Sequence, residues 1–311
     1  MILSASRRTD IPAFFSEWFM NRIGEGFVMA RNPMNYNHIS KINLSPEVVD
    51  CIVFWSKNPA PLVPFLDEIK KAYPFYFQYT INCYERDLEP NLPSVDERIR
   101  TFLDISEKFG KDSVVWRYDP IILTDRYTPE WHTKTFARIA ERLKGYTDTC
   151  VFSFVDLYDK VKNNMKQFAV FPLSEAETET ISAAFSRVAM ANGMKLNTCS
   201  EAVDLSRYNI GRSCCIDKSR IEKLTGREIK AKKDNNQRPE CGCIESVDIG
   251  QYNTCLHSCK YCYANYSRAS VETAFEKHDP HSPLLVGNIG QNDKITERKV
   301  KSIKEQQISL F

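Results

Sequence analysis

Apolar runs alternate with amphipathic stretches along roughly the first 200 residues of the chain. The runs are rich in β-branched and aromatic residues and have the length of buried strands. The stretches between them have the spacing of helices that bury one face. This alternation predicts repeated strand–helix units with parallel strands. The predicted strands are Ile2–Arg7, Phe27–Arg31, Cys51–Trp55, Phe75–Asn82, Ser113–Tyr118, Cys150–Asp156 and Met194–Cys199.

Helix start signals stand between these strands. Ser94 and Ser174 are each followed three residues later by a glutamate, which is the spacing of a capping box. Asp10 and Thr128 each stand shortly before a proline, which is favoured in the first turn of a helix. Seven parallel strands joined by helices predict an α/β fold, specifically a complete or partial (β/α) barrel. A doubly wound sheet is the alternative.

The pattern is weaker beyond residue 200. Residues 216–240 are polar and basic, as in a solvated helix and linker. Residues 264–277 can form a helix. The tail from Asn292 has isolated apolar residues among charges, which predicts a helix packed on the body.

Composition and charge exclude few classes of protein. A chain of 311 residues with 42% hydrophobic content can bury a substantial core. Its 42 basic and 40 acidic residues leave a net charge of +2, so bulk charge indicates neither a nucleic acid nor a membrane as partner. The first ten residues include two arginines and an aspartate, and no later run is long enough to span a membrane. We therefore expect a cytoplasmic protein.

Polar residues follow nearly every predicted strand. In parallel α/β folds the carboxyl ends of the strands gather on one face and form the active site. Two groups combine opposite charges, so Arg7 with Asp10 and Arg117 with Asp119 are the candidate catalytic residues. The simpler explanation for any one of them is that loops are generally polar.

Eleven cysteines in a chain without an export signal indicate metal or redox chemistry, because the reducing cytosol opposes disulfides. Cys51, Cys83 and Cys150 lie in or beside apolar runs, where a small buried hydrophobe is the expected role. The other eight fall between Cys199 and Cys262.

Three of these eight have the spacing C-x-x-x-C-x-x-C. Cys255, Cys259 and Cys262 can therefore share one short loop. Soft thiolates select iron–sulfur clusters or zinc, and the lack of a fourth cysteine in the loop leaves one metal position open, as in reactive sites. The alternative is a zinc site completed by His257. We favour the cluster and expect His257 to lie behind the ligands or to be exposed.

The remaining cysteines predict a second, closed site. Cys199, Cys215, Cys241 and Cys243 supply four thiolates, enough for an auxiliary iron–sulfur cluster. Cys215 is preferred to its neighbour Cys214. A structural zinc ion held by the same four residues is the alternative, because a four-sulfur site does not distinguish the two metals.

With these residues the sequence resembles the radical S-adenosylmethionine superfamily, whose cluster loop has this spacing and an aromatic residue before the last cysteine, here Tyr261. The tyrosine after Cys262 is similar to the spore photoproduct lyase-like branch. The whole pattern Cys-Gly-Cys...Ser-Val-Asp-Ile-Gly...Cys-Leu-His-Ser-Cys-Lys-Tyr-Cys-Tyr-Ala, with the later His-Asp-Pro-His-Ser-Pro-Leu-Leu, resembles domain of unknown function 1848 along the whole chain.

The resemblance implies a four-iron four-sulfur cluster whose open iron binds S-adenosylmethionine and yields a 5′-deoxyadenosyl radical. Tyr261 would lie against the adenine, largely through its backbone. A low-potential donor such as flavodoxin or ferredoxin would supply the electron. The implied division is a barrel body at 1–200 and a C-terminal iron–sulfur segment at 201–311 packed on the catalytic face.

The chain departs from the superfamily pattern in two ways. The cluster loop follows the last predicted strand instead of the first, which requires a circularly permuted barrel. No Gly-Gly pair is present to hold the methionine amino group, so Ser4, Ser6, Arg7 or Asp10 would replace it. The alternative functions are a non-catalytic zinc or iron–sulfur protein for interaction or electron transfer and, more narrowly, a nucleic-acid lesion lyase, which the near-neutral charge disfavours.

Overall fold

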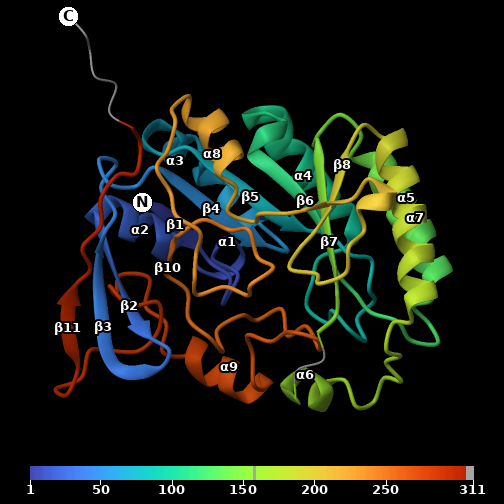
Figure 1. The fold of residues 1–311 in the computed structure, drawn as a ribbon. Coiled ribbons are helices and arrows are strands. Elements are labelled where there is room, and N and C mark those ends of the chain that lie inside the picture. Colours follow the sequence, from blue (N-terminus) through green and yellow to red (C-terminus); the bar gives the residue numbers. More distant parts are fainter. Residues whose placement is uncertain (157–158, 306–311) are drawn as a thin grey trace, which may run out of the picture.

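Six of the seven predicted strands lie in one parallel sheet, which two short later strands extend to eight (Figure 1). The computed structural model describes residues 1–156 and 159–305. The strand order is β10-β1-β4-β5-β6-β7-β8-β9. The strands are β1 (Ile2–Ala5), β4 (Cys51–Ser56), β5 (Phe75–Thr80), β6 (Val114–Ile121), β7 (Thr149–Phe154), β8 (Lys195–Thr198), β9 (Gly211–Arg212) and β10 (Val247–Asp248).

This order decides between the expected folds. From β1 to β8 the strands of the sheet follow one another in chain order, without the reversal that a doubly wound sheet has at its centre. The described sheet has β10 and β9 at its two edges and does not close. The arrangement is therefore α/β with a large parallel sheet, and it is consistent with a partial barrel.

The predicted strand at residues 27–31 exists, but its assignment to the parallel sheet is wrong. β2 (Phe27–Asn32) pairs antiparallel with β3 (Asn35–Asn43) in a second sheet. β11 (Lys294–Glu297) pairs parallel with the other edge of β3, so the helix predicted for this tail is also wrong. The few apolar residues of the tail cannot form a wide buried helix face, whereas an open strand edge satisfies its backbone.

The helices begin where their capping signals predict. In both capping boxes the serine side chain accepts a hydrogen bond from the backbone N–H of the glutamate, and the glutamate side chain accepts one in return. Asp10 and Thr128 cap the helices that follow them. The helices are α1 (Ile11–Phe14), α2 (Ser16–Glu25), α3 (Leu66–Ala72), α4 (Val95–Phe109), α5 (Pro129–Arg142), α6 (Asp159–Asn164), α7 (Glu175–Ala191), α8 (Lys218–Thr225) and α9 (Arg268–Phe275), with 3-10 turns at Ala60–Phe65, Lys111–Ser113 and Ser206–Tyr208.

Different parts of the chain cover the two faces of the parallel sheet. Helices α2 to α5 and α7 bury apolar residues such as Phe102 and Phe185 against one face. The segment from Cys215 to Ile244, which includes α8, packs on the other face. In Figure 1 the yellow-orange chain that leaves α8 crosses in front of the sheet before it reaches α9. The chain beyond residue 200 also supplies the strands β9, β10 and β11.

Burial of the three isolated cysteines is confirmed. Cys51 and Cys150 are fully buried, and Cys83 is 8% exposed. Each therefore fills space in the core, as the apolar runs around it predict. None of the helices in the described ranges is both long enough and apolar enough to cross a membrane.

A buried histidine beside this core makes stability depend on pH. His132 is fully buried, its Nε2 lies 2.9 Å from the Ile122 carbonyl oxygen, and its Nδ1 lies 2.8 Å from the Tyr118 hydroxyl. Burial lowers the pKa of His132 to about 4, despite the bond to the Ile122 carbonyl. In the unfolded chain His132 is therefore protonated below about pH 6.5, whereas in the folded protein it stays neutral until the pH approaches 4.

We expect the contribution of His132 to be complete above pH 6.5 and to be lost as the pH falls towards 4. The loss amounts to about 2 kcal/mol between pH 7 and pH 5. Urea unfolding of the wild type and of His132→Gln at both pH values measures this difference. An identical pH dependence in the two proteins would contradict the prediction.

Candidate metal centre

The cysteine loop is the irregular segment after β10 that carries Cys255, Cys259 and Cys262. It begins directly after β10, which is paired in parallel with β1. Ser4 lies opposite Asp248 in this pairing, and the N–H of Ile249 donates to the carbonyl of Ser4 at 3.1 Å. The loop therefore starts at the carboxyl end of the sheet, next to the first strand of the chain. This placement follows from a two-residue strand, which is too short to recognise in the sequence.

Asp248 fastens the two strands together. Its carboxylate accepts hydrogen bonds from the hydroxyls of Ser4 and Ser6, both at 2.7 Å, and from the N–H groups of Arg7 at 3.0 Å and Gly250 at 2.9 Å. Ser4 is fully buried and Ser6 is 1% exposed. Both predicted cofactor-binding serines thus direct their protons to Asp248 and hold the start of the loop in place.

Asp10 joins the loop to β1 and β4. Its Oδ1 accepts from Ser56 at 2.8 Å and caps α1, while its Oδ2 accepts from the Lys57 N–H at 2.8 Å. Nε2 of His257 lies 2.9 Å from the same Oδ2, and the imidazole is 3% exposed. The carboxylate only accepts, so this imidazole nitrogen donates. His257 is buried behind the loop, and the expectation that it could be exposed is wrong.

A second buried carboxylate holds the other end of the loop. Glu89 accepts from Lys57 Nζ at 2.9 Å and from the hydroxyl of Tyr261. Arg98 Nη1 lies 3.7 Å from Glu89. Burial acts to raise the pKa of Glu89, but Lys57 and Arg98 outweigh it and hold the pKa below its usual value. The ring of Tyr261 is buried and packs edge-on against the ring of Tyr84.

The three cysteines of the loop are close enough to interact electrostatically with one another. Cys259 is 8% exposed, while Cys255 and Cys262 are partly exposed. The Ala264 N–H donates to Cys262 Sγ at 3.3 Å, and the His257 N–H interacts with Cys255. Burial raises the pKa of the Cys255 and Cys259 thiols, and the negative charges of the neighbouring cysteines raise it further. Thiolate formation at this loop thus requires a compensating positive centre.

Buried polar atoms without a hydrogen bond partner gather around this loop. Nine residues contribute ten such atoms in the described part of the chain, and five of those residues lie in or beside the loop. Buried polar groups are normally paired, and their concentration at one place is expected where a ligand completes them. The five are Thr9, Glu89, Arg98, His257 and Asn265.

The second group of cysteines forms a chain of sulfur contacts on the opposite side of Arg7. Cys199 Sγ lies 3.4 Å from Cys215 Sγ. Cys215 also interacts with Cys243, and Cys243 with Cys241. The contact with Cys243 lowers the pKa of Cys241 to about 7, against the effect of burial. The structure therefore brings together the four residues predicted for the second site.

Arg117 points into this second group. Its Nη1 lies 2.9 Å from Cys215 Sγ, and the rest of the guanidinium pairs with Asp119. Burial acts to raise the pKa of Asp119, but Arg117 and Ser153 hold it below its usual value. Two of the four predicted catalytic residues, Arg117 and Asp119, are thus bound to each other beside Cys215.

Arg7 lies between the two cysteine groups. Its carbonyl oxygen accepts from the hydroxyl of Tyr263 at 2.7 Å, and its guanidinium stacks on Trp55 at 5.0 Å. Burial acts to lower the pKa of Arg7, but Cys243 and Cys215 raise it above the usual value. The side chain of Arg7 therefore faces the second group, while its backbone supports the loop.

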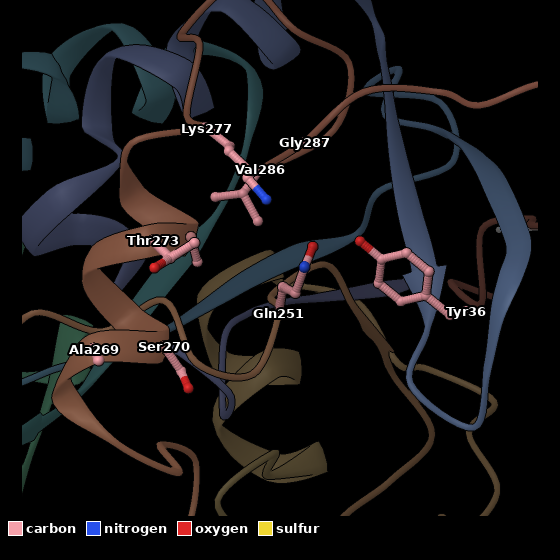
Figure 2. A pocket seen from close by; sticks show the side chains of 9 residues that line it. Tyr36, Gln251, Ala269, Ser270, Thr273, Lys277, Val286 and Gly287 are labelled. Carbon is pink, nitrogen blue, oxygen red and sulfur yellow. The ribbon is translucent and has the colours of Figure 1, made fainter.

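A hollow of about 460 Å³ opens beside the start of the loop (Figure 2). Gln251 lies between α9 and Tyr36 of β3 in this view, Thr273 projects from the side of α9, and Lys277 lies just beyond the end of this helix. The predicted cysteines and charged residues do not line it. The hollow thus adjoins the candidate centre without containing it.

The donor set fits a cluster better than a single ion at the loop. Among residues 1–156 and 159–305, no three or more His, Cys, Asp or Glu side chains are arranged to hold one metal ion. The thiolates of a cluster bind different iron atoms and therefore lie farther apart than the ligands of one zinc ion. Three thiols on one short loop, two N–H groups directed at sulfur and unpaired buried groups behind them suit such a cluster.

Sequence reasoning missed the two carboxylates that hold the loop. Glu89 lies in an irregular segment after β5, and Asp248 lies in the two-residue β10. Neither position carries a periodic or capping signal, and a decisive partner of each, Tyr261 for Glu89 and Ser4 for Asp248, lies more than 100 residues away. A tertiary structure was needed to find them.

Fold and site together define an α/β protein with an open parallel sheet and two groups of cysteines beside it. The chain belongs to the family described as Domain of unknown function (DUF1848), which matches residues 2–264. The predicted resemblance to this family is confirmed over that range, and residues 265–311 lie beyond the match. No curated protein and no solved structure matches the chain.

Proposed function

We propose that the chain is a radical S-adenosylmethionine enzyme whose cluster is held by Cys255, Cys259 and Cys262. The observation that carries the proposal is a loop with three neighbouring thiols, whose buried side is fixed by Asp10 and Glu89. The other cysteine groups do not supply a fourth ligand here, because the second group makes its own contacts around Cys215. One metal position would stay open for substrate.

When bound, the cluster and S-adenosylmethionine supply a 5′-deoxyadenosyl radical, formed as one electron breaks the carbon–sulfur bond and releases methionine. The residues of the chain position this chemistry. The three cysteines bind the cluster, and the bond from His257 to Asp10 fixes the turn between the first two. Lys57 lies over the ring of Tyr261 at 5.4 Å and keeps Glu89 charged next to Cys259.

The strand order supports the permuted arrangement that the proposal needs. β10 comes immediately before the loop and β1 lies next to it, so β1 takes the position of the strand that follows the cluster. A flavodoxin or ferredoxin would deliver the electron, and the hollow beside Gln251 offers space for a substrate close to the loop.

The test measures 5′-deoxyadenosine. Full-length protein is reconstituted with iron and sulfide without oxygen, reduced with dithionite and incubated with S-adenosylmethionine. We expect 5′-deoxyadenosine and methionine from the wild type and less than about 1% of that amount from Cys259→Ala. Cys83→Ala is the matched control, because this buried cysteine belongs to neither group and its removal leaves both intact.

Equal product from Cys259→Ala and the wild type would exclude the assigned cluster. A colourless protein with zinc on the loop and no product would instead favour the non-catalytic class, an interaction or electron-transfer protein.

A further inference from the structure

The second cysteine group is assembled from three separate parts of the chain. Cys199 directly follows β8, Cys215 lies three residues beyond β9, and Cys241 and Cys243 come from the segment before β10. Cys215, Cys241 and Cys243 are 6%, 6% and 2% exposed. Each of these four thiols contacts the next one. Because they come from distant parts of the chain, such an arrangement is not expected by chance.

Two hydrogen bond donors are directed at the sulfurs of this group. The Ile216 N–H donates to Cys243 Sγ at 3.3 Å, and Arg117 donates to Cys215 Sγ at 2.9 Å. Arg117 is 6% exposed and always charged, so its buried guanidinium stabilises a neighbouring anion. One nitrogen of Arg7 is buried without a hydrogen bond partner on the same side. Thiols need no such donors, whereas metal-bound thiolates do.

Local backbone geometry also fixes this group. Gly242 separates Cys241 and Cys243, and a Cβ at this position would lie 2.5 Å from the sulfur of Cys214. The carbonyl of Cys215 accepts from the Tyr76 hydroxyl at 2.6 Å and from Gln78 at 2.9 Å. The sheet therefore orients the side chain of Cys215 towards the other sulfurs, and Cys214 lies outside the chain of contacts.

We propose that Cys199, Cys215, Cys241 and Cys243 form a closed four-thiolate centre for a thiophilic metal, either zinc or an iron–sulfur cluster. Arg117 is its positioning residue, because its guanidinium holds Cys215 and joins the centre to Asp119. In the described residues no three His, Cys, Asp or Glu side chains are already arranged to hold one ion, so binding has to draw the four sulfurs together around the metal. This proposal does not rest on the radical chemistry of the loop.

The test uses the full chain carrying Cys259→Ala, so that metal on the loop does not contribute. We expect this protein to retain either about one zinc or about four irons with sulfide per chain. The metal found tells whether the centre holds a zinc ion or an iron–sulfur cluster. Adding Cys215→Ser should remove at least 90% of that metal. Adding Cys214→Ser, the matched control, should leave the amount unchanged.

Metal retained in the Cys215→Ser protein would overturn the proposal, as would a metal-free parent with a disulfide between Cys199 and Cys215. If Cys215→Ser does not fold, alkylation of the Cys259→Ala parent tests whether the four cysteines bind the metal. The four cysteines should resist iodoacetamide in the loaded protein and react after the metal is removed, as read by peptide mass spectrometry. Equal labelling in both states would also overturn the proposal.

The role of Arg117 is tested separately by competition with a metal chelator. Arg117→Gln should weaken metal binding about 10–100-fold, measured at a temperature where the variant is still folded, because loss of the partner of buried Asp119 also lowers stability. Arg117→Lys should restore part of the loss, because its ammonium keeps the charge but cannot bridge Cys215 and Asp119. Unchanged affinity in Arg117→Gln would show that the arginine does not position the centre.

Discussion

Asp10→Asn should destabilise the protein by about 3 kcal/mol and detach the cysteine loop from the sheet. The carboxylate of Asp10 receives four donors, two on each oxygen. An amide of the same shape must turn its NH₂ group towards one pair of donors, which then lose their acceptor in a buried site. If the amide faces the pair at Oδ2, the N–H of Lys57 and Nε2 of His257 are left unpaired.

Two measurements distinguish this effect from general damage. Urea unfolding gives the stability, and iron bound after reconstitution reports whether the loop still holds its cluster. Asp67→Asn is the matched control, since Asp67 is an exposed partner of Lys108 and such surface pairs contribute little. A loss of stability without any loss of iron would show that Asp10 caps α1 but does not organise the loop.

The parts of the fold that could be predicted from the sequence are those with local causes. Ser94 with Glu97 and Ser174 with Glu177 begin helices because each pair satisfies its own backbone groups within one turn. The apolar runs around Cys51 and Phe75 are buried on both faces, as strands of a parallel sheet require. Such signals do not depend on the rest of the chain.

The pairing of strands could not be predicted from such local signals. Residues 27–32 have the composition of a strand, but their partner is the polar β3, in which only two of nine positions are buried. β11 gains its structure only from the free edge of β3, about 250 residues earlier. In both cases the deciding hydrogen bonds join distant segments, and no local pattern records them.

The candidate site shows the same division. The spacing of Cys255, Cys259 and Cys262 is local and was readable. The cofactor-binding role of Ser4 and Ser6 stays a prediction, and the bonds from their hydroxyls to Asp248 on the neighbouring strand could be found only in the fold. The four cysteines of the second group could be named from the sequence, but Arg117 as the donor to Cys215 required the fold.

Gly250→Ala should be the most damaging single methyl group that can be added to the loop. A Cβ at this position would lie 1.9 Å from Ser6 Oγ and 2.5 Å from Ser6 Cβ, and Ser6 is buried and cannot move aside. We expect a loss of about 3 kcal/mol and of most loop-bound iron. In a Ser6→Gly background the same change should cost far less, because the clashing atoms are gone.

Gly24→Ala is the control for this prediction. Its Cβ meets nothing within 4 Å in α2, so unfolding in urea should show equal or greater stability. Equal costs for Gly250→Ala in both backgrounds would mean that the close approach of β1 to the loop does not determine how the loop is held.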